Sequence, residues 1–354
     1  SAADVLWEIS TTQAPGPSAD LSDFASNLGY TLPQASIVRM QDGSWAAIVA
    51  NGYESANNKA VLYIIDIKTG HILKSIDTGA GSAASPNGLS TPIAVDEDGD
   101  HITDSIFAGD LLGNMWKFDV SSSNPNSWDV AHKVSGTPTP HYIALDSSGV
   151  RQPITSKPQV GRHPNGGLMI YFGTGKYYAN NDQIIGPSPQ VQTFYGIRDA
   201  GSVVADRSVL QKQTILAEST LTIPATVTPP APAFDIDVRV TTDTLVPYPT
   251  KEGWYMDLIS PVNGAEGERV VSNPLLRNGR IIFSTMTPNP DPCDWGGSSW
   301  LMELDAVNGK RLDGSPFDVN NDGNIDLADL VHIYDTNGDG IIDASDDIAV
   351  SGIR

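Results

Sequence analysis

The chain has 354 residues, a hydrophobic fraction of 40% and a formal net charge of −21 at pH 7. That length can bury a large core, either as one large all-β domain or as two ordinary domains. The acidic balance argues against nucleic acid or an anionic membrane as the main partner, because both are themselves negatively charged. No stretch approaches the roughly 20 consecutive apolar residues of a membrane-spanning helix, so no membrane span is expected.

The glycine and proline content indicates the class of fold, and the cysteine content limits the disulfides that can form. The 33 Gly and 25 Pro favour many short strands joined by tight turns. No initiator Met or signal peptide is present, so we expect a mature or processed product. Cys293 is the only cysteine, which excludes a disulfide within this chain. It is either a buried thiol or half of a disulfide with a partner in another segment.

Four segments share one pattern, in which short strands are followed by a β-branched strand and then by an aromatic or aliphatic strand that ends on Asp. The segments are 36–53 with 60–73, 91–120, 157–178 with 192–200, and 273–289 with 298–312. Such sheets cannot bury both faces alone but can stack radially on their neighbours, as the blades of a β-propeller do. A β-sandwich would also supply the strands, but the repeated strand order favours the propeller. We therefore expect blades over residues 1–312.

The propeller is expected to be incomplete in this chain. The opening stretch ADVLWEIS (3–10) is similar to the blade ending NMWKFDV (114–120) but has no strands before it. Four blades are at the low end of the roughly four to eight that close a ring. An upstream segment or a second chain would then supply the earlier blades.

Between the third and fourth segments the sequence changes character. Residues 221–234 are rich in proline and are predicted to be an extended surface loop. The stretches VRVTT (238–242) and GWYMDL (253–258) are predicted to be a further strand pair.

The stretch DEDGDHITD (96–104) holds four aspartates and a glutamate between two apolar strand-like runs. Like charges at this density repel, so a bound cation is expected rather than a merely solvated turn. Hard oxygen ligands at loop positions 1, 3, 5, 7 and 9 favour Ca²⁺. Position 12 is Phe107, so the bidentate glutamate of an EF-hand is missing and a β-hairpin calcium loop is predicted. The expected ligands are Asp96, Asp98, Asp100, the backbone carbonyl of Ile102, and Asp104.

Two further loops with the calcium-loop spacing follow near the end of the chain, each with Gly at position 6. They raise the expected number of Ca²⁺ sites to about three. Aspartate replaces glutamate at position 12 in both, which shortens the reach to the metal. The expected ligands are Asp318, Asn320, Asp322, Asn324 (backbone carbonyl), Asp326 and Asp329 in one loop, and Asp335, Asn337, Asp339, Ile341 (backbone carbonyl), Asp343 and Asp346 in the other.

Residues 313–354 are predicted to be an EF-hand- or dockerin-like pair of calcium loops, with a disordered acidic tail as the alternative. Ile325 and Ile342 stand at position 8 of the two loops, where their side chains can pair. The stretch LADLVHIY (327–334) is predicted to be an amphipathic helix of about two turns, which is marginal in water. Metal binding is therefore expected to order this region.

No arrangement typical of an enzyme appears. The sequence FGTGKYY (172–178) contains Gly-Thr-Gly-Lys but lacks the first glycine, the Ser/Thr and the following helix of a phosphate-binding loop. The six histidines are scattered, and no Gly-x-Ser-x-Gly motif is present. We therefore predict no catalytic residues and a protein that is not an enzyme.

Taken together, these stretches resemble the C-terminal domain of the type IV pilus tip-associated adhesin and biogenesis family, the PilC/PilY group. The resemblance is clearest over 28–70, 94–120, 171–178, 192–199 and 291–312. It implies a modified, quinoprotein-type β-propeller exported to the bacterial cell surface and pilus tip. In the family, occupancy of the calcium loop, here 96–104, is linked to pilus extension against retraction and to adhesion. The family's variable N-terminal region is missing, so its adhesive specificity cannot be transferred.

The first functional hypothesis is a calcium-binding, non-enzymatic module at a pilus tip, whose partners are minor pilins and a host or surface receptor. The alternatives are a quinone-cofactor (PQQ-type) dehydrogenase-like propeller and a carbohydrate-binding propeller. The single cysteine, and acids confined to hairpin loops, count against the dehydrogenase.

Overall fold

The computed structural model describes residues 7–10, 21–223, 225–227, 230–289, 291 and 296–354, so Cys293 lies outside the described residues. The chain forms two compact units, Ser1–Val160 with Gly201–Asp206, and Gly161–Ala200 with Arg207–Arg354. One short α-helix, α1 (Leu21–Asn27), is present in the described part of the chain, and the rest is strands, turns and 3₁₀ turns. No helix of the described residues is long and apolar enough to cross a membrane.

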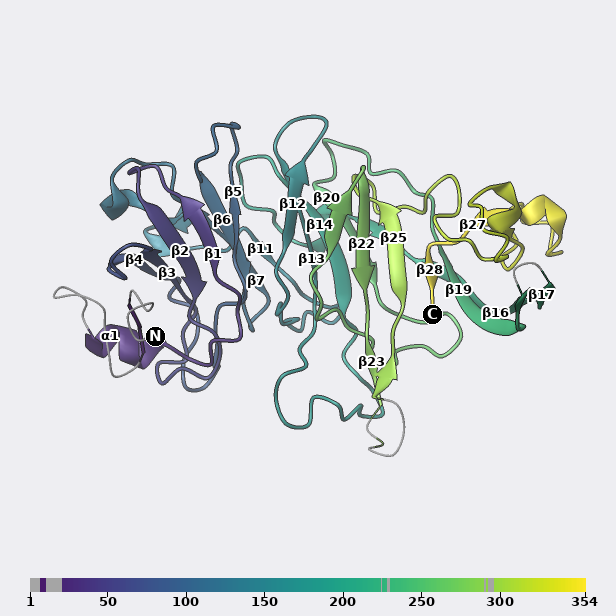
Figure 1. Ribbon diagram of the computed structural model, residues 1–354, viewed down its shortest axis with the longest axis horizontal. Coiled ribbons are helices and arrows are strands. Elements are labelled where there is room, and N and C mark those ends of the chain that lie inside the picture. Colours follow the sequence, from purple (N-terminus) through teal and green to yellow (C-terminus); the bar gives the residue numbers. More distant parts are fainter. Residues whose placement is uncertain (1–6, 11–20, 224, 228–229, 290, 292–295) are drawn as a thin grey trace. The chain divides into compact units, whose positions relative to one another are not determined.

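The first unit contains two main antiparallel sheets (Figure 1). The first is a meander of neighbouring strands, with the order β1 (Ser36–Arg39), β2 (Trp45–Ala50), β3 (Val61–Asp66) and β4 (Ile72–Asp77). The second has the order β5 (Ile93–Val95), β6 (Ser105–Gly109), β7 (Asn114–Asp119) and β11 (Tyr142–Ile143), with β8 (Asp129–Val130) also pairing with β7. A small hairpin joins β9 (Lys133–Val134) to β10 (Thr137–Pro138), and a 3₁₀ turn, η2, covers Pro125–Ser127.

The core of the first unit lies between these two sheets. Ile48 and Ile64 of the first sheet and Ile106 and Trp116 of the second belong to one buried cluster. Strand β6 is buried along its whole length, as a strand covered on both faces must be. Removing this apolar surface from water, at about 25 cal/mol per Å², holds the sheets face to face.

The second unit contains the other two main sheets. One has the order β12 (Gln159–Arg162), β13 (Leu168–Gly173), β14 (Thr193–Asp199), β20 (Gly253–Asp257) and β15 (Gln211–Gln213), with β15 parallel to β20. The other has the order β21 (Leu275–Arg277), β22 (Arg280–Ser284), β25 (Leu301–Asp305), β28 (Gly352–Ile353), β19 (Phe234–Thr241) and β16 (Ile215–Ile223). The minor pairs are β17 (Thr226–Val227) with β18 (Pro230–Ala231), β23 (Thr287–Pro288) with β24 (Gly297–Ser298), and β26 (Leu330–Val331) with β27 (Ile348–Ala349); η3 covers Arg207–Val209.

Aromatic packing joins the two sheets of the second unit. The rings of Phe194 in β14 and Phe283 in β22 stack with centroids 3.8 Å apart. Trp254 in β20 is fully buried and donates from Nε1 to the carbonyl of Ala306 over 3.0 Å. Gly309 has φ +66° and faces the Trp254 ring so closely that a side chain there would collide with it. The turn after β25 therefore depends on a glycine at this position.

The repeat read from the sequence corresponds to the sheets. Each of the four predicted segments supplies strands to one of the four main sheets, and the all-β class is confirmed. In the opening stretch, residues 7–10 are described and form no strand, although Nε1 of Trp7 donates to the carbonyl of Ile67 over 2.8 Å.

Three local predictions are wrong. The described part of 221–234 is not a simple loop, because β16 runs to Ile223, β17 pairs with β18, and β19 begins at Phe234 and pairs with β16. The stretches 238–242 and 253–258 are strands up to Thr241 and Asp257, but they pair in different sheets. Residues 327–334 form no α-helix; a 3₁₀ turn and strand β26 stand there instead.

The predicted C-terminal region is a long excursion between two adjacent strands. Strand β25 ends at Asp305, and the chain then passes through both acidic loops before β28 pairs back with β25. The loop pair thus belongs to the second compact unit. The separate domain predicted over residues 313–354 stays a prediction.

Candidate metal centre

The first acidic loop connects β5 to β6, so that both ends are fixed by a buried sheet. Two of its residues have left-handed backbone conformations, Gly99 with φ +92° and His101 with φ +69°. Such residues turn successive backbone N–H groups toward the inside of the loop. Asp96 receives two of them, on Oδ1 from Gly99 over 2.6 Å and on Oδ2 from His101 over 2.8 Å. The hydrogen bond from Gly99, followed by that from His101, lowers the pKa of Asp96 and keeps it ionised.

The next two acids continue this arrangement. Asp98 accepts the N–H of Asp100 over 3.1 Å, and Asp100 accepts the N–H of Ile102 over 2.8 Å. Each carboxylate therefore accepts the backbone N–H two residues ahead through one oxygen, and its second oxygen takes no part in this hydrogen bond. Ile102 is partly buried rather than part of the core.

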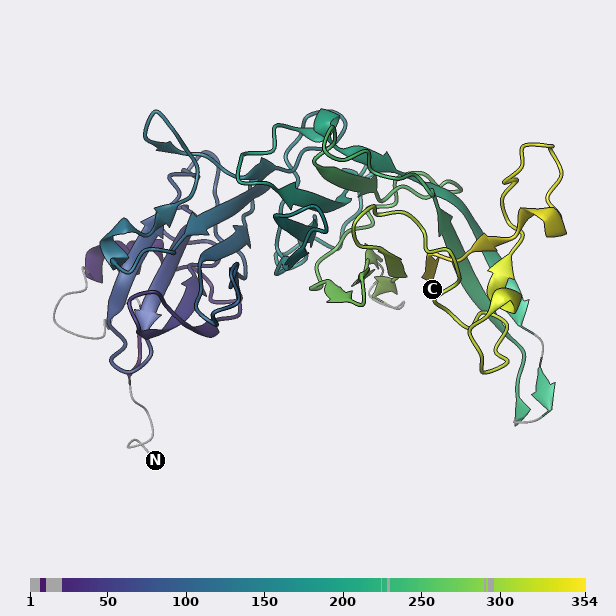
Figure 2. The same cartoon turned by 90° about the horizontal axis from the view of Figure 1, so that it is seen from above.

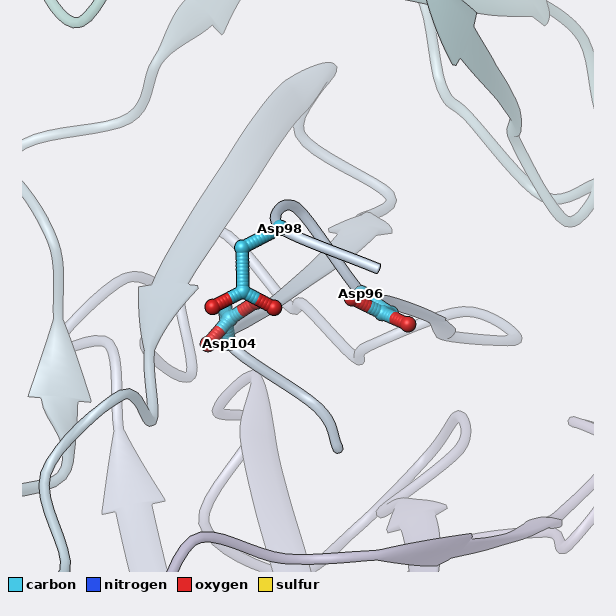
Figure 3. A group of neighbouring side chains, drawn as sticks. All are labelled: Asp96, Asp98 and Asp104. Atoms are coloured by element: carbon cyan, nitrogen blue, oxygen red, sulfur yellow. The ribbon is translucent and has the colours of Figure 1, made fainter. Parts of the chain in front are cut away.

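Three carboxylates converge in this loop (Figure 3). Asp96, Asp98 and Asp104 each offer an oxygen, and these oxygens lie within 4.8 Å of one another. Among the described residues this is the one such group of three or more acids, cysteines or histidines. Asp100 is outside the group, although the sequence placed it among the ligands. The cluster supplies three hard oxygen donors to one centre, which suits a divalent cation.

Asp104 is held from two sides. Oδ2 accepts the N–H of Glu97 over 2.8 Å, and Oδ1 accepts Nε2 of Gln41 over 3.0 Å. The Glu97 side chain is not part of the converging group. Ser105 donates to it over 2.7 Å, and Lys117 forms an ion pair with it at 3.2 Å. Glu97 is therefore engaged in contacts that support the loop.

A polar pocket of about 460 Å³ lies beside the cluster. Asp98 and Asp104 form part of its lining, and the rest includes Lys117, Asp119 and His132. An ion held by the cluster would consequently be reachable from solvent.

The two C-terminal loops have the same backbone form as the first. Residues with positive φ stand at positions 4 and 6 of every loop. In the C-terminal loops they are Asn321 and Gly323, with φ +59° and +87°, and Gly338 and Gly340, with φ +77° and +83°. His101 in the first loop therefore occupies the position that glycine occupies in the other two.

The hydrogen bonds within the loops also repeat. The first acid accepts backbone N–H groups from positions 4 to 6, and the side chains at positions 3 and 5 each accept the N–H two residues ahead. The equivalent bonds are Asp318 with Asp322 and Gly323, Asn320 with Asp322, Asp322 with Asn324, Asp335 with Gly338 and Gly340, Asn337 with Asp339, and Asp339 with Ile341.

The acid that closes each loop binds the N–H at position 2. Asp329 and Asp346, at position 12, are fully buried and accept the N–H of Val319 over 2.9 Å and of Thr336 over 2.7 Å. In the first loop Asp104, at position 9, makes this contact instead. The shorter loop is therefore closed without a residue at position 12.

Position 9 has a different role in the C-terminal loops. Asp326 and Asp343 are N-caps of 3₁₀ turns, η4 (Leu327–Asp329) and η5 (Ala344–Asp346), and accept N–H groups from Ala328 and Ser345, each over 2.8 Å. The hydrogen bond from the Ser345 N–H, and then that from its hydroxyl, lowers the pKa of Asp343. The expected contact between position-8 side chains is not made as a buried pair, since Ile325 and Ile342 are 61% and 54% exposed.

The donor chemistry fits calcium in each loop. Carboxylate, amide and carbonyl oxygens are the ligands that Ca²⁺ prefers, and it accepts irregular sets of six to eight of them. Sulfur and imidazole, which softer metals select, are not among the described side chains that converge in the first loop. In the C-terminal loops Asn320 and Asn337 supply amide oxygens in place of one carboxylate.

Sequence reasoning missed two supporting residues. Gln41 is 63 positions from Asp104, and no pattern along the chain relates them. The positive φ of His101 could have been inferred by aligning the three loops, because Gly323 and Gly340 stand at the same position.

Comparison with known proteins gives the family. A family model described as the PilY1 beta-propeller domain matches residues 1–226. A Xylella fastidiosa protein named type IV pilus biogenesis factor PilY1 homolog is 38% identical over 317 residues, which cover 86% of this chain and 20% of that protein. The type IV pilus biogenesis factor PilY1 of Pseudomonas aeruginosa is 34% identical over 350 residues, which cover 91% of this chain and 28% of that protein.

A solved structure agrees with this assignment. The crystal structure of the Pseudomonas aeruginosa PilY1 C-terminal domain matches with a TM-score of 0.78 and 31% identity, over 94% of this chain and 67% of that one. The class of the molecule is thus an all-β, modified β-propeller, as predicted. The chain belongs to the PilY1 β-propeller family. It spans between a fifth and just over a quarter of the length of the curated relatives it matches, and the C-terminal loop pair lies beyond the part that the family model matches.

Proposed function

We propose that this chain is a calcium-binding, non-enzymatic module of a type IV pilus protein, exported to the bacterial cell surface and pilus tip. There it would act in pilus assembly, in the balance of extension and retraction, and in adhesion. The supporting observation is the convergence of Asp96, Asp98 and Asp104 on a propeller whose relatives are named type IV pilus biogenesis factors.

Calcium would act by holding the loops in one shape. Four aspartates in the first loop repel one another, and a bound divalent ion removes that repulsion. A ligand that binds only the folded state stabilises it by about 2.7 kcal/mol at a hundred times its dissociation constant. In the first loop, calcium binding would also stabilise the sheet that contains β5 and β6, since the loop joins these two strands directly.

The proposed partners are minor pilins at the pilus tip and a host or surface receptor. The remainder of the propeller would come from an upstream segment of the full-length protein or from a second chain. The loop would supply these partners with a calcium-ordered surface, because the pocket beside the cluster is open and polar.

The test is made with the full-length protein in its own bacterium. Asp98→Asn removes one converging charge but keeps the oxygen that accepts the N–H of Asp100. We expect normal protein levels with altered numbers of surface pili and reduced twitching motility. Asp42→Asn is the matched control, because Asp42 is in the same unit, caps Ser44 within a turn and lies outside the acidic loops. Normal piliation and motility with Asp98→Asn would contradict the proposal.

A further inference from the structure

Strand β28 is short and depends on other segments to stay in its sheet. It has two residues, Gly352 and Ile353, yet it is the central link of a six-stranded sheet. Gly352 faces Met302 of β25 on one side and Arg239 of β19 on the other. So few ladder positions give little stability by themselves, because each backbone hydrogen bond contributes only about 1 kcal/mol net.

The excursion that carries the two acidic loops packs against the partner strand of β28. Strands β26 and β27 pair through Val331 with Ile348, and both side chains are buried. They share one apolar cluster with Val238 and Val240 of β19 and with Val350, two residues before β28. Figure 2 shows this excursion lying along the hairpin of β16 and β19. The position of β28 is therefore fixed by the packing of the loop pair.

The residue that closes each acidic loop lies next to one of these two strands. Asp329, which closes one loop on Val319, immediately precedes β26. Asp346, which closes the other on Thr336, stands two residues before β27. If either loop opens, the strand next to it loses its fixed end.

Strand β28 also pairs directly with a residue of a buried ionic group, Arg239. Arg239 is fully buried and pairs with Glu218 at 2.7 Å and Glu268 at 2.8 Å. Its carbonyl accepts the N–H of Ser351 over 2.8 Å. The hydroxyl groups of Thr241 and Ser351 lie 2.9 Å apart. Release of β28 would break the backbone hydrogen bond between Ser351 and Arg239 and leave β19 and β25 each paired on one side only.

We infer that Ser315–Val350 is a calcium-dependent clasp that holds β28 between β19 and β25. This inference rests on the proposed binding of calcium by the two C-terminal loops. Calcium would keep both loops closed, and the closed loops would keep β26, β27 and Val350 in the apolar cluster. Calcium loss would release β28 and loosen the hairpin of β16 and β19, whereas the first unit would keep its sheets.

Hydrogen exchange measured by mass spectrometry tests the clasp. The peptide covering 349–354 is followed in millimolar calcium and in excess chelator. We expect exchange at least about tenfold faster in chelator, as for a segment that opens locally. The combined variant Asp322→Asn and Asp339→Asn should show the fast rate even in calcium, while each asparagine still accepts the N–H two residues ahead. Asp98→Asn, in the other unit, is the control and should leave this peptide unchanged in calcium.

A second variant tests the packing without touching the loops. Val331→Ala shortens a buried side chain of the clasp and should speed exchange of 349–354 in calcium. Calcium binding to the same samples is measured by calorimetry. If the C-terminal loops bind calcium but chelator leaves the exchange of 349–354 unchanged, the clasp is wrong and the proposed calcium binding stands. If calorimetry shows that the two C-terminal loops bind no calcium, the clasp fails together with the proposed binding at these two loops.

Discussion

Gln41 donates a hydrogen bond from Nε2 to Oδ1 of Asp104 over 3.0 Å, although the two residues are 63 positions apart. Gln41 lies in the turn between β1 and β2, and Asp104 ends the first acidic loop. The contact fixes a proposed calcium ligand to the neighbouring sheet of the same unit. Groups that orient metal ligands in this way typically contribute 10- to 100-fold to affinity.

We therefore expect Gln41→Ala to weaken calcium binding at the first loop by about tenfold. The two C-terminal loops should be unaffected. Calorimetric titration of the whole chain measures the affinities. Gln34→Ala is the control, because the structure gives Gln34 a hydrogen bond through its backbone N–H only. Equal affinities for the two variants would show that the contact does not orient Asp104.

The backbone of His101 has a left-handed conformation, which is unfavourable for a residue with a side chain. Its φ is +69°, where Gly323 and Gly340 stand in the other loops. A left-handed conformation costs roughly 1–2 kcal/mol for a residue with a Cβ. We expect His101→Gly to raise the free energy of unfolding of the first unit. The gain is reduced by the greater conformational entropy of glycine in the unfolded chain.

Urea unfolding measures the change in His101→Gly. Lys68→Gly is the matched control, because Lys68 also lies in an exposed turn but is not among the residues with positive φ. It should lower stability by up to about 1 kcal/mol. Destabilisation of both variants to the same extent would contradict the interpretation of His101.

The buried arginine in the second unit should be sensitive to substitution. Arg239→Met leaves Glu218 and Glu268 without their cation, and breaking a buried pair typically costs about 3–5 kcal/mol. Arg280→Met is the matched control. Its pair with Glu303, at 2.7 Å, is partly exposed, and exposed pairs contribute about 0–1 kcal/mol. Thermal unfolding compares the two variants. Equal losses of stability would contradict the conclusion that the buried ion pairs of Arg239 matter more than the exposed pair of Arg280.

His163 predicts a pH dependence in the second unit. Burial, together with the positive charge of Arg198, lowers the pKa of His163. The residue is 4% exposed, its ring meets Tyr248 edge to face at 4.4 Å, and Nδ1 accepts the N–H of Asn165 over 3.0 Å. A neutral ring is therefore built into the folded state.

The sign follows from linkage. Above the unfolded-state pKa of about 6.5 the ring is neutral in both states. As the pH falls through that value, the unfolded chain gains a proton that the folded chain does not, so the free energy of unfolding falls. The loss continues until the pH reaches the lowered folded-state pKa. Urea unfolding measured between about pH 8 and pH 5 should show this fall in the free energy of unfolding, and His163→Leu should reduce its slope against pH. An unchanged slope would exclude His163 as the cause.

Much of the fold followed from local patterns. The four segments with alternating or continuous apolar strands became four sheets, because strand patterns are local and the turns between them carry Asp and Gly. Asp66 and Asp305 show why: each accepts N–H groups of the following turn. Gly70 and Gly309 then take positive φ and close it.

The errors arose where long-range pairing decided the structure. Gly352 and Ile353 have no strand signature, and their place between β19 and β25 depends on residues far away in the sequence. The proline-rich stretch after Ile223 reads as a loop, yet its ends are paired within a hairpin. Periodicity within a window cannot report either relationship.

The acidic loops were located from spacing alone, but the roles of individual acids were not. Position 9 was treated alike in all three loops. Asp104 closes its loop, whereas Asp326 and Asp343 cap 3₁₀ turns while Asp329 and Asp346 close theirs. This difference depends on the segment that follows each loop, a β-strand in the first and a 3₁₀ turn in the others.

The central claim is that the clustered aspartates bind calcium, and calorimetric titration of the whole chain tests it most directly. We expect about three sites per chain in the wild type. Asp98→Asn, Asp322→Asn and Asp339→Asn should each remove one site, since each variant loses a carboxylate charge but keeps an oxygen that accepts the N–H two residues ahead. Absence of calcium binding by the wild type, or an unchanged number of sites in all three variants, would contradict the account.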